Sequence, residues 1–187
     1  MSSPNTFKMT VNLADFGAAM AKVSKGMHEA VRPAAQAGSQ VLYDEVIKNV
    51  SALKGEGRLK KAIYQVYSGQ NNNNKRRALY VISWRTTGKD RAPHGWLVEY
   101  GYIQRYQTYK NRKGEWKTMA RPENRGKKAP NTKNRKVLDA FYMPRTDGPV
   151  QWRAHSFIRN ATDKMPAARE AMRQRFAEEL RARGVLK

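Results

Sequence analysis

Residues 62–67 read Ala-Ile-Tyr-Gln-Val-Tyr, and residues 78–84 read Ala-Leu-Tyr-Val-Ile-Ser-Trp. Both runs are rich in β-branched and aromatic residues, which favour extended strands. The segment between them contains four consecutive Asn at 71–74 and ends in three cations at 75–77. Asn favours turn conformations, and three adjacent cations make a strand there unfavourable. The sequence therefore predicts an antiparallel hairpin with a long basic tip.

Two helical stretches are predicted before this hairpin. A short strand comes first, because residues 7–13 alternate apolar and polar side chains. From about Asp15 the apolar residues recur three or four positions apart, which places them on one face of a helix. They are Phe16, Met20, Val23 and Met27. A second helix follows, with Pro33 in its first turn, where proline is tolerated.

The second helical stretch carries an apolar stripe that is rich in small residues. The stripe consists of Val31, Ala34, Ala35, Gly38, Leu42 and Val46. Small side chains allow another backbone to approach closely, so we expect this helix to lie flat on a sheet.

A third strand pair and a last helix are predicted in the second half of the chain. Residues 102–109 and 115–119 are separated by a short linker that ends in Gly114, as a bulged hairpin requires. Near the C-terminus, apolar residues recur at helical spacing between residues 165 and 180. We expect this amphipathic helix to begin near Pro166 and to stop at Gly184.

The composition excludes several classes of protein. The 187 residues suit one compact domain, and 37 Lys and Arg against 15 Asp and Glu give a net charge of +22. This charge argues against an ordinary neutral enzyme and requires an anionic counterpart. No apolar run is long enough for a membrane span, and the first residues do not resemble a secretory signal. The absence of Cys excludes disulfides and thiolate metal sites, and is consistent with a reducing cytoplasm.

Much of the positive charge lies in one block, residues 105–136, which holds twelve cations and two carboxylates. Residues 120–136 contain almost no apolar side chains, so we expect them to be mobile when unbound. Aromatic residues between the cations either stack on bases or pack across strands. The candidates for contact with DNA or with an acidic protein are Lys75, Arg76, Arg77, Arg125, Lys127, Lys128, Lys133, Arg135 and Lys136. Charge alone does not separate these two kinds of partner.

The sequence offers no catalytic constellation. His28, His94 and His155 lie far apart in the sequence and do not have the spacing of a zinc site. The carboxylates are scattered among cations, whereas a metal-dependent nuclease needs them clustered. We therefore predict no catalytic residues, no metal, no cofactor and no enzymatic activity.

Three short patterns resemble, in this order, the tail-component family of long-tailed bacteriophages, proteins of the neck that joins the head to the tail. The first is Gly-Arg-Leu-Lys-Lys-Ala-Ile at 57–63, ahead of the main hairpin. The second is Gly-Trp-Leu-Val-Glu-Tyr-Gly at 95–101. The third is Ala-His-Ser-Phe-Ile-Arg-Asn-Ala at 154–161, before the last helix. The resemblance covers most of the chain except 102–150, a basic insertion that the family does not explain.

The resemblance implies an α+β fold over residues 1–187: a twisted antiparallel sheet flanked by N-terminal helices and a C-terminal helix, with the basic hairpin and loop insertion at 102–150. It also implies a structural virion protein that completes the tail and joins it to the head as part of a ring, expected to be a hexamer. Its partners would be head-closure or adaptor proteins and tail-terminator or tail-tube proteins, with DNA contact in the channel and no membrane. The chain would be assembled in the host cytoplasm and found in the virion neck.

Glu99 is the candidate for a subunit contact. It lies among apolar and aromatic neighbours, where a carboxylate needs a cationic or backbone partner. An Arg of the same chain and a salt bridge to a neighbouring subunit both remain open. The alternative function for the whole chain is a stand-alone nucleic-acid-binding protein without sequence preference.

Overall fold

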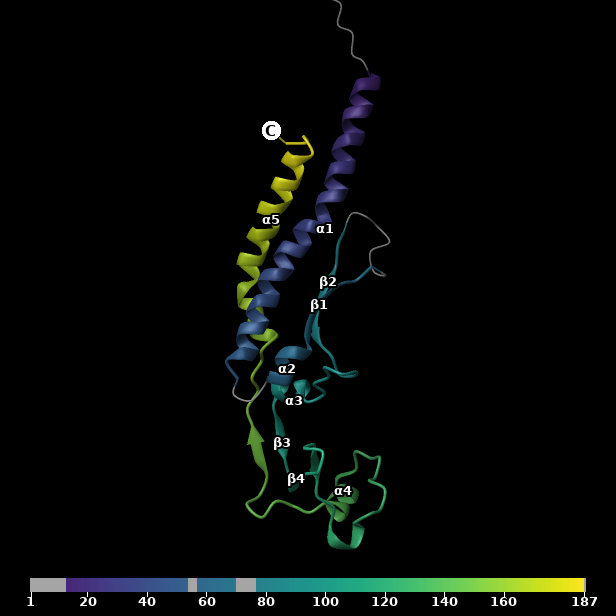
Figure 1. Cartoon of the computed structure of the whole chain (residues 1–187), viewed down its shortest axis with the longest axis vertical. Coiled ribbons are helices and arrows are strands. Elements are labelled where there is room, and N and C mark those ends of the chain that lie inside the picture. Colours follow the sequence, from purple (N-terminus) through teal and green to yellow (C-terminus); the bar gives the residue numbers. More distant parts are fainter. Residues whose placement is uncertain (1–12, 54–56, 70–76, 187) are drawn as a thin grey trace, which may run out of the picture. The chain divides into compact units, whose positions relative to one another are not determined.

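The chain divides into two compact units (Figure 1). The computed structural model describes all residues except 1–12, 54–56, 70–76 and 187. The first unit is formed by Met1–Pro93 with Phe157–Lys187, and the second by His94–Ser156. The predicted insertion, 102–150, lies entirely within the second unit. Helices and small antiparallel sheets occur together, so the α+β class is confirmed.

The first unit contains a hairpin, two long helices and two short helical segments. Its elements are α1 (Leu13–Ser51), α2 (Gly57–Ala62), β1 (Ile63–Tyr67), β2 (Tyr80–Trp84), η2 (Arg159–Lys164) and α5 (Met165–Ala182). The predicted strand at 7–13 falls almost wholly on residues outside the described part of the chain, and Leu13 opens α1.

A single helix of 39 residues, α1, replaces the two predicted helical stretches. Pro33 lies inside this helix, not in a first turn, so that prediction was wrong. An interior proline removes one hydrogen bond and costs roughly 3 kcal/mol. Helix-favouring neighbours such as Ala34 and Ala35, together with packing against α5 along the helix, offset this cost.

The stripe of small residues on α1 faces α5 and not a sheet, which corrects the second prediction for this region. At Gly38 an added Cβ would lie 2.3 Å from Cγ of Met172 and 2.9 Å from the carbonyl oxygen of Ala168. Glycine is therefore the residue that lets the α5 backbone approach α1 here. Figure 1 shows α5 running beside α1. The hairpin contacts α1 at other positions, where the Gln65 side-chain amide donates a hydrogen bond to the Ser39 hydroxyl.

The predicted hairpin of residues 62–67 and 78–84 is confirmed as the antiparallel pair β1–β2, with Ile63 opposite Trp84 and Tyr67 opposite Tyr80. One face packs inward: Ile63 is buried, and the Trp84 ring meets the Phe157 ring edge-on at 5.6 Å. The opposite face, which we call the outer face of the hairpin, exposes three aliphatic side chains. They are Val66, Leu79 and Val81. The basic tip at 70–76 lies outside the described residues.

The C-terminal helix is confirmed with its predicted limits. Helix α5 begins at Met165 with Pro166 in its first turn, and η2 precedes it. Gly184 follows the helix with a φ of +64°, a conformation that favours glycine. Ala168 and Leu180 of the predicted stripe are buried.

The second unit consists of short elements. They are α3 (Gly95–Tyr100), β3 (Tyr102–Gln104), β4 (Thr108–Lys110), β5 (Trp116–Thr118), η1 (Pro122–Asn124), α4 (Arg135–Phe141) and β6 (Val150–Trp152). The predicted hairpin across Gly114 is confirmed as β4–β5, and β3 pairs with β6. The chain thus has three two-stranded sheets in its described part, not one twisted sheet. The three-residue strands β4 and β5 expose every side chain, so neither strand buries a face against the rest of the unit.

Candidate nucleic-acid interface

Three extended segments of the second unit hold one another through a closed cycle of backbone hydrogen bonds. The Gln107 amide donates to the Met143 carbonyl at 3.0 Å, and the Met143 amide donates to the Met119 carbonyl at 2.9 Å. The Met119 amide then donates to the Gln107 carbonyl at 2.8 Å. Each segment is therefore fixed against both of the others, which gives the β4–β5 hairpin a firm base.

The basic segment after this base, for which mobility in the unbound state is predicted, has local structure: η1 and the first residues of α4 fall within 120–136. The Arg121 guanidinium donates to the Asp139 carbonyl at 3.1 Å, and the Asn124 side-chain amide donates to the Ala140 carbonyl at 3.1 Å. Carbonyls in the last turn of a helix have no partner within the helix, so these contacts satisfy the end of α4. At the other end, the Asn134 side chain accepts a hydrogen bond from the Lys136 amide and caps the helix.

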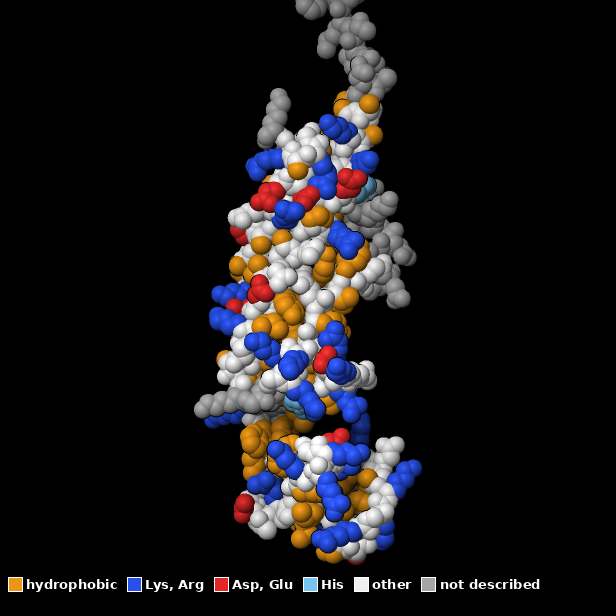
Figure 2. Space-filling model, viewed as in Figure 1, with side chains coloured by type: hydrophobic (Ala, Val, Ile, Leu, Met, Phe, Trp, Pro, Cys, Tyr) orange, Lys and Arg blue, Asp and Glu red, His pale blue; other side chains and the backbone are white. Residues whose placement is uncertain are grey.

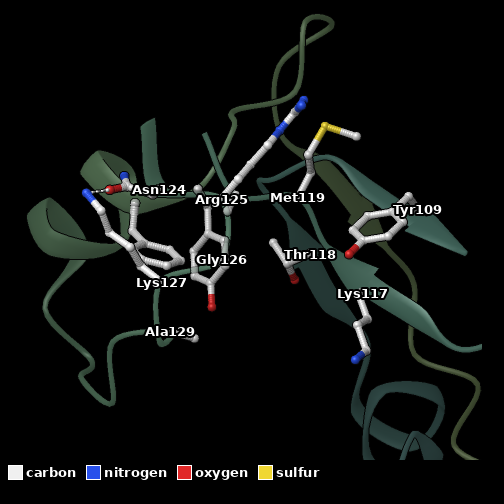
Figure 3. A pocket seen from close by; sticks show the side chains of 12 residues that line it. Tyr109, Lys117, Thr118, Met119, Asn124, Arg125, Gly126, Lys127 and Ala129 are labelled. Atoms are coloured by element: carbon white, nitrogen blue, oxygen red, sulfur yellow. Dashed lines mark hydrogen bonds between the residues drawn. The ribbon is translucent and has the colours of Figure 1, made fainter. Parts of the chain in front are cut away.

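A groove of about 710 Å³ lies between the β4–β5 hairpin and the segment 124–129. Twelve residues line it: Tyr109, Lys117, Thr118, Met119, Ala120, Asn124, Arg125, Gly126, Lys127, Ala129, Phe141 and Tyr142. Figure 3 shows Tyr109 and Lys117 across the opening from Asn124 and Lys127. The lining therefore combines three cations with three aromatic rings and contains no carboxylate.

The second unit has too few carboxylates to neutralise the cations of the groove. This unit holds 14 Lys and Arg against five Asp and Glu. Asp139 is engaged elsewhere: it pairs with Arg135 at 3.6 Å and accepts a hydrogen bond from the Tyr106 hydroxyl at 2.7 Å. Burial, reinforced by this hydrogen bond, raises the pKa of Tyr106 above its usual range. Figure 2 shows blue Lys and Arg side chains interspersed with orange hydrophobic ones over this unit.

The groove brings together only two of the predicted contact residues, Arg125 and Lys127. Lys127 donates to the Asn124 side-chain oxygen at 3.2 Å, whereas Arg125 makes no ion pair with any described residue. Lys136 lines a second hollow of about 460 Å³, which shares Asn124 and Phe141 with the groove.

The other predicted contact residues lie outside these two hollows. Lys128 and Lys133 are exposed without an ion pair to the described part of the chain, and Arg135 is paired with Asp139. Arg77 is exposed in the first unit. Lys75 and Arg76 fall outside the described residues.

Sequence reasoning did not single out Lys117, Phe141 and Tyr142 as groove residues. Lys117 belongs to the basic block, and its place opposite Tyr109 follows from the register of the β4–β5 hairpin. The predicted hairpin thus contained a usable signal for this pair. Phe141 and Tyr142 come from the end of α4, and only the tertiary structure brings them to the groove.

Glu99 is buried in α3, with 2% of its surface exposed, so the predicted burial of this carboxylate is confirmed. The chain returns to α3 through residues of the third pattern: the His155 amide donates to the Val98 carbonyl at 2.8 Å, and the Ser156 hydroxyl donates to the Glu99 carbonyl at 3.3 Å. Both alternatives for Glu99, an Arg of the same chain and a neighbouring subunit, stay predictions.

No three His, Asp or Glu side chains come close enough within the described ranges to hold a metal ion. Among the described helices, none combines the length and apolar character needed to cross a membrane. Comparisons of the chain with family models, with curated proteins and with solved structures find no match.

Proposed function

We propose that this chain is a structural subunit of the neck of a long-tailed bacteriophage, where it completes the tail and joins it to the head as part of a homo-oligomeric ring. One observation carries the proposal. The second and third of the resembling patterns, more than fifty residues apart in sequence, meet through two hydrogen bonds to α3, one from the His155 backbone amide and one from the Ser156 side-chain hydroxyl. Patterns that meet in space act as a scaffold, which is the role that the resemblance implies for them.

The apolar surface of the first unit supports a role in assembly. The outer face of the hairpin exposes 48% of Val66, 43% of Leu79 and 37% of Val81. At the start of α1, Phe16 and Met20 lie on one helical face and are 62% and 53% exposed. Contiguous exposed apolar side chains of this kind mark protein–protein contacts more often than free surface. A ring of identical subunits would cover them.

The proposal is tested by measuring the mass of the purified chain with light scattering after size exclusion and by imaging it with electron microscopy. We expect a ring of several subunits, and we expect Val66→Asp on the outer face to release monomers. Val137→Asp is the matched control because Val137 is similarly exposed, at 43% against 48% for Val66, but lies on α4 of the second unit. A chain that stays monomeric with and without head-closure or tail-tube proteins would exclude a ring subunit.

A second candidate function, a stand-alone nucleic-acid-binding protein, is favoured by the basic groove. It predicts a soluble monomer or dimer that binds nucleic acid in a salt-dependent manner. The same size measurement separates the two functions, because a ring is expected only of the neck protein. Conserved gene neighbours that encode a portal and a tail tube would also favour the neck.

A further inference from the structure

We propose that the groove of the second unit binds an unpaired stretch of nucleic acid, with phosphates held by Lys117, Arg125 and Lys127 and a base stacked on Tyr109. This inference goes beyond the neck function and does not depend on ring formation. It commits to one of the two partners, nucleic acid or acidic protein, that the net charge leaves open.

The charges of the groove suit a phosphodiester chain. Lys117 comes from β5 and Lys127 from the segment across the opening, so cations border the groove on two sides; the Arg125 side chain extends along a third direction, away from both (Figure 3). No carboxylate lines the space to compete with an incoming anion. The volume of about 710 Å³ lies within the roughly 300–1,000 Å³ typical of small-ligand sites, so it can admit nucleotide units.

The aromatic rings distinguish a nucleotide from an acidic peptide. Tyr109 is 44% exposed and stands opposite Lys117 in the hairpin register, so a ring and an ammonium group emerge side by side from neighbouring strands. A base can stack on the ring while its phosphate meets the cation. Asp and Glu side chains would use the cations but have no planar ring to stack on Tyr109.

The far wall of the groove is preformed. Phe141 and Tyr142 pack edge to face with ring centroids 5.0 Å apart, and Tyr142 also contacts Tyr106 at 5.3 Å. The closed cycle of hydrogen bonds beneath β4 and β5 fixes the strand that carries Tyr109. A preorganised site loses less conformational entropy when a ligand binds.

The aromatic contact also selects the form of the nucleic acid. In a duplex the bases are stacked on one another and paired, so their faces are closed to Tyr109. An unpaired strand exposes the faces of its bases.

Fluorescence anisotropy with the full chain tests the inference. The probes are a labelled oligothymidylate, an abasic phosphodiester oligomer of the same length and charge, a duplex, and poly-glutamate. We expect the oligothymidylate to bind at least about fivefold more tightly than the abasic oligomer, the lower end of what one base–aromatic stack contributes. The abasic oligomer isolates the base contribution because its charge is the same.

Variants locate the binding to the groove. Tyr109→Ala should remove the difference between the two single-stranded probes, and Tyr109→Phe should keep it, which controls for folding. Lys117→Ala should weaken both probes and lower the salt dependence by about one phosphate contact. Lys89→Ala, at an exposed site in the first unit, is the matched control and should change nothing.

Equal binding of the abasic oligomer or of poly-glutamate would overturn the inference, as would a preference for the duplex. If the chain forms a ring but does not bind the oligothymidylate in this way, the groove site is excluded and the neck function is unaffected. If the chain is a monomer that does bind it, the neck function is excluded and the groove site is supported.

Discussion

The close approach of α5 to α1 at Gly38 can be tested with one added methyl group. In Gly38→Ala the new Cβ would sit 2.3 Å from Cγ of Met172, where ordinary carbon contacts are about 3.5–4.0 Å, and 2.9 Å from a backbone oxygen. Overpacking of this kind costs about 1–3 kcal/mol. Alanine in a helix interior is favoured over glycine by about 0.8–1.0 kcal/mol. We expect a net loss of unfolding free energy of about 1 kcal/mol.

Gly17 supplies the matched control on the same helix, because an added Cβ there meets nothing within 4 Å. Gly17→Ala should gain up to about 1 kcal/mol from helix propensity alone. The difference between the two variants removes the propensity gain that they share and leaves the packing cost. Urea denaturation followed by far-UV circular dichroism measures both.

A Gly38→Ala chain at least as stable as Gly17→Ala would refute the close approach. Combining Gly38→Ala with Met172→Ala should recover part of the loss but not all of it, because the carbonyl of Ala168 remains in place.

Three further predictions concern single side chains. Gly101→Ala should destabilise the second unit by about 2 kcal/mol or more, because the φ of residue 101 is +71° and the new Cβ would lie 2.6 Å from the Trp152 carbonyl oxygen. Faster amide hydrogen exchange at residues 150–156 would report this loss of stability. A hydrogen bond from Arg183 lowers the pKa of Glu179 in the folded chain. The contribution of this contact to the free energy of unfolding is therefore complete at pH values above the ordinary carboxyl pKa of about 4.5, and it is lost as the pH falls through the lower pKa of the folded state. Glu179→Gln should therefore flatten the acid side of the melting-temperature profile. Asn49→Ala should cost about 1 kcal/mol in urea denaturation, because its amide donates at 3.0 Å to the carbonyl of a buried residue ahead of η2.

About half of the candidate site could be predicted from the sequence. It placed Tyr109 on a strand and Lys117 on the strand that follows Gly114, and hairpin geometry then sets them opposite each other. It also named Arg125 and Lys127 from charge alone. It did not reach Phe141 and Tyr142, because the segment that joins them to the groove depends on side-chain contacts to the end of α4. Those contacts have no periodic signature in the sequence.

Local chemistry determined β1, β2, the turn at Gly114 and the span of α5 between Pro166 and Gly184, because each depends on neighbours within a few residues. Tertiary structure decided what local rules left open or answered wrongly. Helix α1 continues through Pro33 because packing against α5 offsets a local cost, and the stripe around Gly38 faces a helix because small residues fit a helix or a sheet equally well. The element that packs against such a stripe depends on contacts between residues far apart in the sequence, so only the tertiary structure identifies it.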